Sequence, residues 1–222
     1  PGEQAFDLYA TYGLPLEITR DVAREQGLEV AEAGFKKAMD EHRIASGAGA
    51  FGYLEGSEVD VYRPLVQDLQ SQSKLGIDGV NYNPYDALEI ERPVLAIVHA
   101  GEPVQKVKPG DKVEVLLPAT CFYIEAGGQV SDTGMITSVV QGWEIRVTDI
   151  RKPAAGVIVH AGEVMRGEPK VGDLAVAAVD AVRRKDIVRN HTATHLLHAA
   201  LHEILGRHAR QAGSLVAPDH LR

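Results

Sequence analysis

Short apolar runs rich in β-branched residues, each closed by a turn, fill the middle of this sequence and restrict its possible folds most strongly. The runs cover residues 94–99, 112–117, 133–140, 143–150, 156–160 and 174–179. Strands at this spacing, with turns rather than helices between them, are typical of antiparallel barrels and sandwiches. We therefore predict a small antiparallel β-barrel over residues 94–180.

Two turns in this region nearly repeat each other. Residues 107–113 and 169–175 each place Gly-Asp directly before an apolar run. Gly-Asp at this position is a signal for entry into a hairpin strand. The repeat therefore supports the strand assignment and predicts no ligand site.

The first part of the chain has helical periodicity instead. Thr19 stands where a helix N-cap is expected and Gly27 where a C-cap is expected, and a second helix is predicted over residues 32–45. Residues 49–93 have poor periodicity and several turn-forming groups, so we expect a connector with one or two short elements.

The last segment, residues 181–222, is predicted to hold one long helix from about residue 186 to 208, then a turn into a strand. The expected apolar stripe of this helix is Ile187, Leu197, Leu201, Ile204 and Leu205. Together these elements predict the α+β class: a helical segment (1–48), the connector (49–93), the barrel (94–180) and the start of an α/β core (181–222).

Charge is distributed unevenly along the chain. The net charge of −8 argues against a uniformly basic nucleic-acid-binding protein, yet residues 181–222 carry seven Lys or Arg and only three Asp or Glu. A polyanion is therefore expected at the carboxyl end, although a solvated helix face explains Arg183, Arg184, Lys185 and Arg189 equally well. No apolar run approaches the roughly 20 residues of a membrane span, and we expect a cytoplasmic protein without a membrane partner.

His191 and His195 are the strongest candidates for metal ligands. Four residues apart on a helix, they project from one face and can reach one Zn²⁺ ion. Two ligands do not complete a zinc site, and HxxxH alone is a weak pattern. Thr192 occupies the position at which helical zinc proteases carry a general-base Glu, which disfavours peptide hydrolysis. For His198 and His202 on nearly the same face, solvent exposure or backbone hydrogen bonding is the favoured interpretation.

Gly127, Gly128 and Gln129 form the second candidate site. Adjacent glycines let the backbone approach a ligand closely, and Gln129 offers both a donor and an acceptor. Composition alone favours a tight turn between strands. Cys121 is the only cysteine, which excludes an intrachain disulfide and favours a small buried apolar residue over a nucleophile.

In their order along the chain these segments resemble the alanyl-tRNA synthetase family. The resemblance rests on residues 12–28, on the Gly-Gly-Gln segment at 122–134, and on Arg189–Leu201 with its continuation at 211–216. It covers most of the chain, with residues 70–90 the least familiar part. Peptide-release factors also contain a Gly-Gly-Gln tripeptide, but there it lies in a loop among basic residues. Here Glu125 and Asp132 flank it, so we reject that identification.

The resemblance implies a zinc-dependent editing region that hydrolyses tRNA(Ala) mischarged with serine or glycine. His191 and His195 would be zinc ligands, Thr194 and Gln211 would shape the amino-acid pocket, and Gln129 would lie nearby. A synthetic pocket built for alanine cannot exclude glycine, or strongly exclude serine, so a second hydrolytic site is required.

The family also uses ATP, Mg²⁺ and alanine, but its aminoacylation motifs are not found in residues 1–222. Its second metal motif, a Cys and a His, would lie beyond Arg222, so half of the zinc ligands are expected here. We therefore expect a truncated piece of the enzyme that neither aminoacylates nor edits well by itself.

Three alternatives stay open. A stand-alone trans-editing deacylase is disfavoured by the helices of residues 1–48. A non-catalytic RNA-binding β-barrel module predicts no zinc and tolerance of His191→Ala and His195→Ala. The third is a truncation product with a purely structural character.

Overall fold

The computed structural model describes residues 2–12, 16–45, 58–138, 140–206, 208 and 213–222. The chain divides into two compact units, Pro1–Leu54 and Glu55–Arg222. This division leaves the four-part organisation expected from the sequence as a prediction. Each unit is described by itself.

The first unit is helical, with α1 (Gly2–Tyr12), α2 (Leu16–Glu25) and α3 (Glu32–Ala45). The predicted bounds of α3 are confirmed. The predicted N-cap at Thr19 is wrong, because α2 begins three residues earlier and Thr19 lies buried inside it. A small core joins α1 to α3, in which the rings of Phe6 and Phe35 meet edge to face at 5.9 Å.

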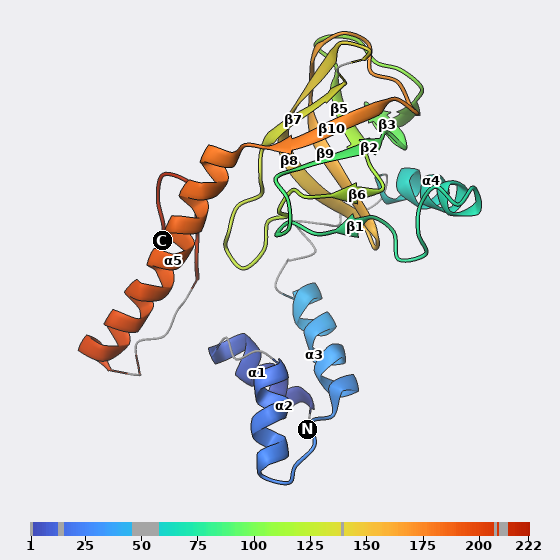
Figure 1. Ribbon diagram of the computed structural model, residues 1–222. Coiled ribbons are helices and arrows are strands. Elements are labelled where there is room, and N and C mark those ends of the chain that lie inside the picture. The colour runs from blue at the N-terminus through green and yellow to red at the C-terminus, as the bar shows by residue number, and fades with distance from the viewer. Residues whose placement is uncertain (1, 13–15, 46–57, 139, 207, 209–212) are drawn as a thin grey trace. The chain divides into compact units, whose positions relative to one another are not determined.

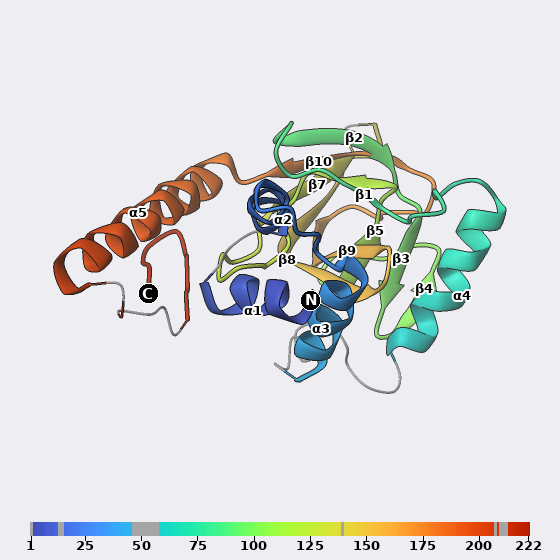
Figure 2. The same cartoon turned by 90° about the horizontal axis from the view of Figure 1, so that it is seen from below.

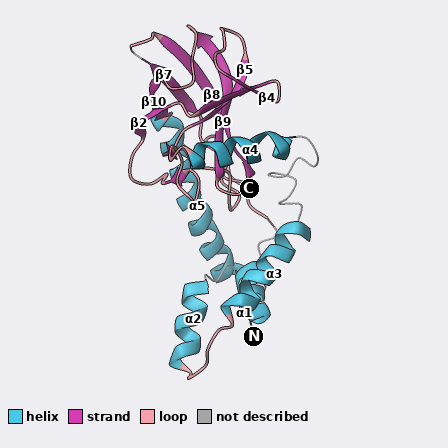
Figure 3. Cartoon of the chain, turned by 90° about the vertical axis from the view of Figure 1, so that its right-hand side faces the viewer, coloured by secondary structure: helices cyan, strands magenta, loops and turns pink. Residues whose placement is uncertain are grey.

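The second unit is built on one large antiparallel sheet (Figures 1 and 3). Its hydrogen-bonded order is β2-β10-β7-β8-β9-β5-β3-β4. The strands are β2 (Glu89–Pro93), β3 (Ala96–His99), β4 (Glu102–Val104), β5 (Lys112–Leu116), β7 (Gly134–Ser138), β8 (Trp143–Ala154), β9 (Val157–Arg166) and β10 (Leu174–Val179). The short strands β1 (Asn81–Tyr82) and β6 (Ala119–Thr120) pair in parallel beside it.

The α+β class and the six predicted strands are confirmed, but the sheet is not a closed barrel. Strands β2 and β4 are its edges in the described residues. The chain turns a corner between β2 and β3, where Val94 N–H donates to Asp173 O while Leu95 N–H donates to Leu116 O. Neighbouring residues thus pair with different strands, which bends the sheet without a closing ladder.

The predicted connector contains more regular structure than expected. Helix α4 (Glu58–Ser71) runs for 14 residues with Pro64 inside it. Tyr62 and Leu69 are buried against the core of the sheet. The Tyr62 hydroxyl donates to Glu114, whose carboxylate also accepts from Arg151.

The two similar turns do have the same structure. In each, an Asp carboxylate accepts from the backbone N–H three residues earlier, Asp111 from Lys108 at 3.0 Å and Asp173 from Lys170 at 3.1 Å. The glycine before each Asp has a positive φ, +88° and +92°. Both turns lead directly into a strand, as predicted, and Asp173 also accepts from the indole N–H of buried Trp143.

The core of the sheet encloses one histidine. His160 is fully buried, with Nδ1 3.1 Å from Val115 O and Nε2 2.9 Å from Thr120 Oγ1. Because a carbonyl only accepts, Nδ1 carries the proton and the Thr120 hydroxyl donates to Nε2. Burial lowers the pKa of His160 to about 4. Among the described helices, none has the length and apolar character needed to cross a bilayer.

Candidate functional site

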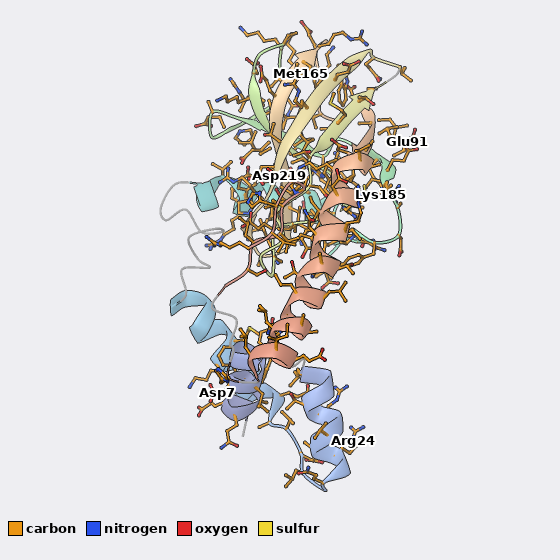
Figure 4. All side chains as sticks on the ribbon, turned by 90° about the vertical axis from the view of Figure 1, so that its left-hand side faces the viewer. Asp7, Arg24, Glu91, Met165, Lys185 and Asp219 are labelled. Carbon is orange, nitrogen blue, oxygen red and sulfur yellow. The ribbon has the colours of Figure 1, made fainter. Side chains whose placement is uncertain are left out.

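Helix α5 (Ala181–Leu205) carries both candidate metal ligands, and a single residue, Asp180, separates it from β10. Its start lies five residues before the predicted position, because Asp180 caps it by accepting from the N–H groups of Val182 and Arg183. Figure 4 shows Lys185 at the end of α5 nearer the sheet. The helix is therefore attached directly to an inner strand.

A buried ion pair holds the first turns of α5 against the loop before β7. The Arg184 Nε donates to both carboxylate oxygens of Asp132, at 2.9 and 3.0 Å, and the side chains are 12% and 1% exposed. Arg184 also donates to Pro84 O and Cys121 O. The hydrogen bond to Asp132 raises the pKa of Arg184. We call this arrangement the Asp132–Arg184 clamp.

The clamp changes the interpretation of the basic cluster. Arg184 is largely buried and paired with Asp132, so it is not a solvated charge. Arg183 is partly exposed and donates to Ser131 O. Arg189 pairs with Asp186 on the surface, and Lys185 is exposed. No local sequence pattern indicates the clamp, because 52 residues separate its partners.

The Gly-Gly pair forms a tight turn, as composition favoured. Ala126 and Gln129 exchange both backbone hydrogen bonds, at 3.0 and 3.2 Å, around Gly127 and Gly128, whose φ angles of +59° and +82° suit glycine. The turn is also a contact surface, since a Cβ added to Gly128 would lie 2.5 Å from Ser214 O. Glycine is therefore required at this position on two grounds.

Residues 213–222 return along the helix to this turn (Figures 1 and 2). Val216 N–H donates to Gly128 O at 2.7 Å, and Val130 N–H donates to Val216 O at 3.1 Å. The Asn190 amide donates to Ala217 O at 2.7 Å, which ties the same segment to α5. Three distant parts of the chain thus meet at one place.

Gln129, His191 and His195 lie at this meeting point. The Nδ1 atom of His191 is 2.6 Å from Oε1 of Gln129, whose side chain is buried. The rings of His191 and His195 stack with their centroids 5.1 Å apart and their planes inclined by 25°. The predicted shared face of the two histidines is realised, and Gln129 joins them from 62 residues away in the sequence.

The donor set suits zinc in part. Two neighbouring imidazoles are common Zn²⁺ ligands, but a stable site needs three or four. No group of three or more His, Cys, Asp or Glu side chains suited to a metal ion occurs within the described parts of the chain. These residues therefore offer two ligands, and zinc binding stays a prediction.

The other candidate residues divide into three groups. The Thr194 hydroxyl donates to Asn190 O at 2.8 Å on a partly exposed face of α5. Gln211, together with Arg207 and Arg210, lies outside the described residues. Cys121 is buried, and burial raises the pKa of its thiol, which fits the predicted apolar role.

Most of the predicted apolar stripe of α5 is exposed. Of its members only Ile187 is buried, whereas Ile204 is 79% exposed. The rings of His198 and His202 contact each other at 4.2 Å, two turns beyond the Gln129 contact. The contacts described above between α5 and other segments thus lie in its first half, up to His191.

The family described as tRNA synthetases class II (A) matches residues 1–183. Curated relatives named alanine–tRNA ligase match the whole chain, including α5. Those from Chloroflexus aurantiacus, Anaeromyxobacter dehalogenans and Stenotrophomonas maltophilia are 44%, 45% and 46% identical over 222, 225 and 224 residues. The chain spans about a quarter of the length of these relatives, 23–24%.

Proposed function

Because the chain belongs to the alanyl-tRNA synthetase family, we propose that it serves an alanine–tRNA ligase that joins alanine to tRNA(Ala). The proposed parent reaction uses ATP and Mg²⁺ and takes place in the cytoplasm. The names and the identity of the curated relatives support this activity.

Within that enzyme, the second unit contributes to the hydrolysis of mischarged Ser-tRNA(Ala) and Gly-tRNA(Ala). One observation carries this assignment: the Gly-Gly-Gln turn and the helix with both histidines come together through the contact between Gln129 and His191. Hydrolysis at a second site is physically needed, since a pocket for the alanine methyl group rejects glycine and serine by only modest factors.

His191 and His195 would hold a zinc ion through neutral imidazole nitrogens, together with ligands outside the described residues. When bound, zinc would polarise the ester carbonyl or a water molecule. The remaining steps belong to the protein, which must bind the tRNA end, orient the ester and select the amino acid.

Thr194 is the proposed selector for serine. Its hydroxyl proton is engaged with Asn190 O, so its oxygen lone pairs are left to accept a hydrogen bond. A serine side chain can donate that bond and an alanine side chain cannot. Gln211 is proposed to line the same pocket.

The decisive experiment replaces both histidines in the ligase that carries this segment. We expect His191→Ala with His195→Ala to abolish zinc binding and to slow deacylation of Ser-tRNA(Ala) and Gly-tRNA(Ala) by at least tenfold, while alanylation is retained. His198→Ala on the same helix is the matched control. Unchanged deacylation in the double variant, with tRNA binding intact, would instead favour the RNA-binding module.

Thr194→Val tests selection separately, because valine keeps the shape and removes the hydroxyl. We expect slower hydrolysis of Ser-tRNA(Ala), by about tenfold for one hydrogen bond of about 1.4 kcal/mol, with little change for Gly-tRNA(Ala). An unchanged rate for Ser-tRNA(Ala) would remove Thr194 from the pocket.

A further inference from the structure

The ring of His191 lies between an amide oxygen and a second imidazole. Its Nδ1 is 2.6 Å from Gln129 Oε1, and the ring of His195 stacks on it. An amide oxygen only accepts hydrogen bonds, so the proton of a neutral His191 ring lies on Nδ1. The lone pair is then on Nε2.

Contacts within the protein hold Gln129 in place. Its backbone pairs with Ala126 on one side and lies beside Val216 on the other, and the residue is only 6% exposed. Gly128 permits this close approach to Ser214. The position of the acceptor is therefore set by two segments, the turn itself and residues 214–216, and does not depend on α5 alone.

Neutral imidazoles exchange between two tautomers, and only one presents a lone pair at Nε2. Ligating histidines usually donate their other ring N–H to a carbonyl, carboxylate or water, which fixes both tautomer and ring orientation. Gln129 has the correct group at the correct ring nitrogen to do this for His191.

We propose that Gln129 is a positioning residue for His191: its amide oxygen selects the Nδ1–H tautomer and leaves Nε2 to bind a divalent metal ion. The inference rests on the proposed metal-dependent function and assigns a role to a residue outside the histidine pair. Gln129 itself contacts neither metal nor substrate in this role.

Two substitutions of Gln129 test the role of its oxygen. Gln129→Glu keeps an acceptor of the same length and loses the amide donor, whereas Gln129→Met keeps the length and loses both. The ¹⁵N chemical shifts of the His191 ring in the metal-free chain report the tautomer. They are recorded at a pH about two units above the ordinary pKa of histidine, where the ring is neutral. Competition with a chromophoric chelator reports the affinity for Zn²⁺ alone.

We expect the Nδ1–H tautomer in the unmodified chain and in Gln129→Glu, with zinc affinity retained. Gln129→Met should populate both tautomers and bind zinc about tenfold more weakly, as loss of such a partner usually does. His198→Ala, on the same helix, should leave both readings unchanged. Amide spectra establish whether each variant is folded. If Gln129→Met does not fold, Gln129→Asn takes its place, because asparagine withdraws the amide oxygen by one methylene.

Two results would overturn the proposal: an unchanged His191 tautomer in Gln129→Met, or a Gln129→Glu variant that behaves like Gln129→Met. The second result would mean that the amide N–H faces the ring. Absence of zinc binding to the unmodified chain would contradict the proposed metal function instead, and the tautomer measurements would still decide the role of Gln129.

Discussion

The sheet and helix α5 belong to one unit yet are stabilised by different interactions. In the sheet, Trp143, Ile136 and Ile145 are completely buried, whereas α5 buries only Ile187 and leaves Leu196 67% exposed. Directed polar contacts hold the helix instead: the Asp180 cap, the Asp132–Arg184 clamp, and the side chains of Asn190 and His191.

This difference in stabilising interactions decides how sensitive the candidate site is to substitution. Burial of apolar area is non-directional and is shared among many residues. Hydrogen bonds and ion pairs are directional, and here only a few of them place α5. Loss of one polar contact should therefore disturb the helix more than loss of one apolar group disturbs the sheet.

The largest expected effect comes from breaking the clamp. Asp132→Asn leaves the Arg184 charge buried without its counterion, and we expect the free energy of unfolding to fall by about 3–5 kcal/mol. Chemical denaturation measures the loss. Asp186→Asn removes a surface partner of Arg189 and should cost less than about 1 kcal/mol. Equal costs would show that the clamp does not hold the helix.

Lowering the pH tests the contribution of buried His160 to the stability of the sheet. The folded-state pKa of His160 is about 4, below its ordinary 6.5, so the unfolded chain binds the extra proton between these values. Stability should be fully present above about pH 6.5 and should fall by about 3 kcal/mol as the pH drops to about 4, at 1.36 kcal/mol per unit. His160→Gln should flatten this part of the stability profile. An unchanged slope would place the lost stability in other groups.

The smallest expected effect is on the exposed face of α5. Leu196→Gln should change the free energy of unfolding by less than about 0.5 kcal/mol, because the side chain has little burial to lose. Ile145→Val in the sheet is the comparison and should cost about 1 kcal/mol. A larger cost for Leu196→Gln would mean that this helix face is packed in solution.

Most of the sheet could be predicted from the sequence because its signals are local. Six β-branched runs became strands, and the two Gly-Asp turns enter strands as expected. Strand β2 was missed because its residues, Glu89–Pro93, are largely charged and exposed at an edge. Helix α4 was missed because Pro64 and the surrounding turn residues hid its apolar spacing, and Thr19 failed as an N-cap because serine and threonine also occur inside helices.

The site was predictable only in its parts. Helical spacing placed His191 and His195 on one face, and the glycines indicated a turn. Their meeting depends on the clamp and on the return of Val216 to Gly128, contacts between residues far apart in the sequence. Neither contact has a local sequence signature, so periodicity alone could not join Gln129 to His191.

Only one residue, Asp180, separates β10 from α5, so the direction of the helix is set at this residue. At 1.5 Å per residue, a tilt of about 5° would move the helix axis by about 1.4 Å near His191 and by about 3 Å near Leu205. His191 thus lies nearly halfway along the helix, where an error in helix direction moves it less than half as far as it moves the end of the helix.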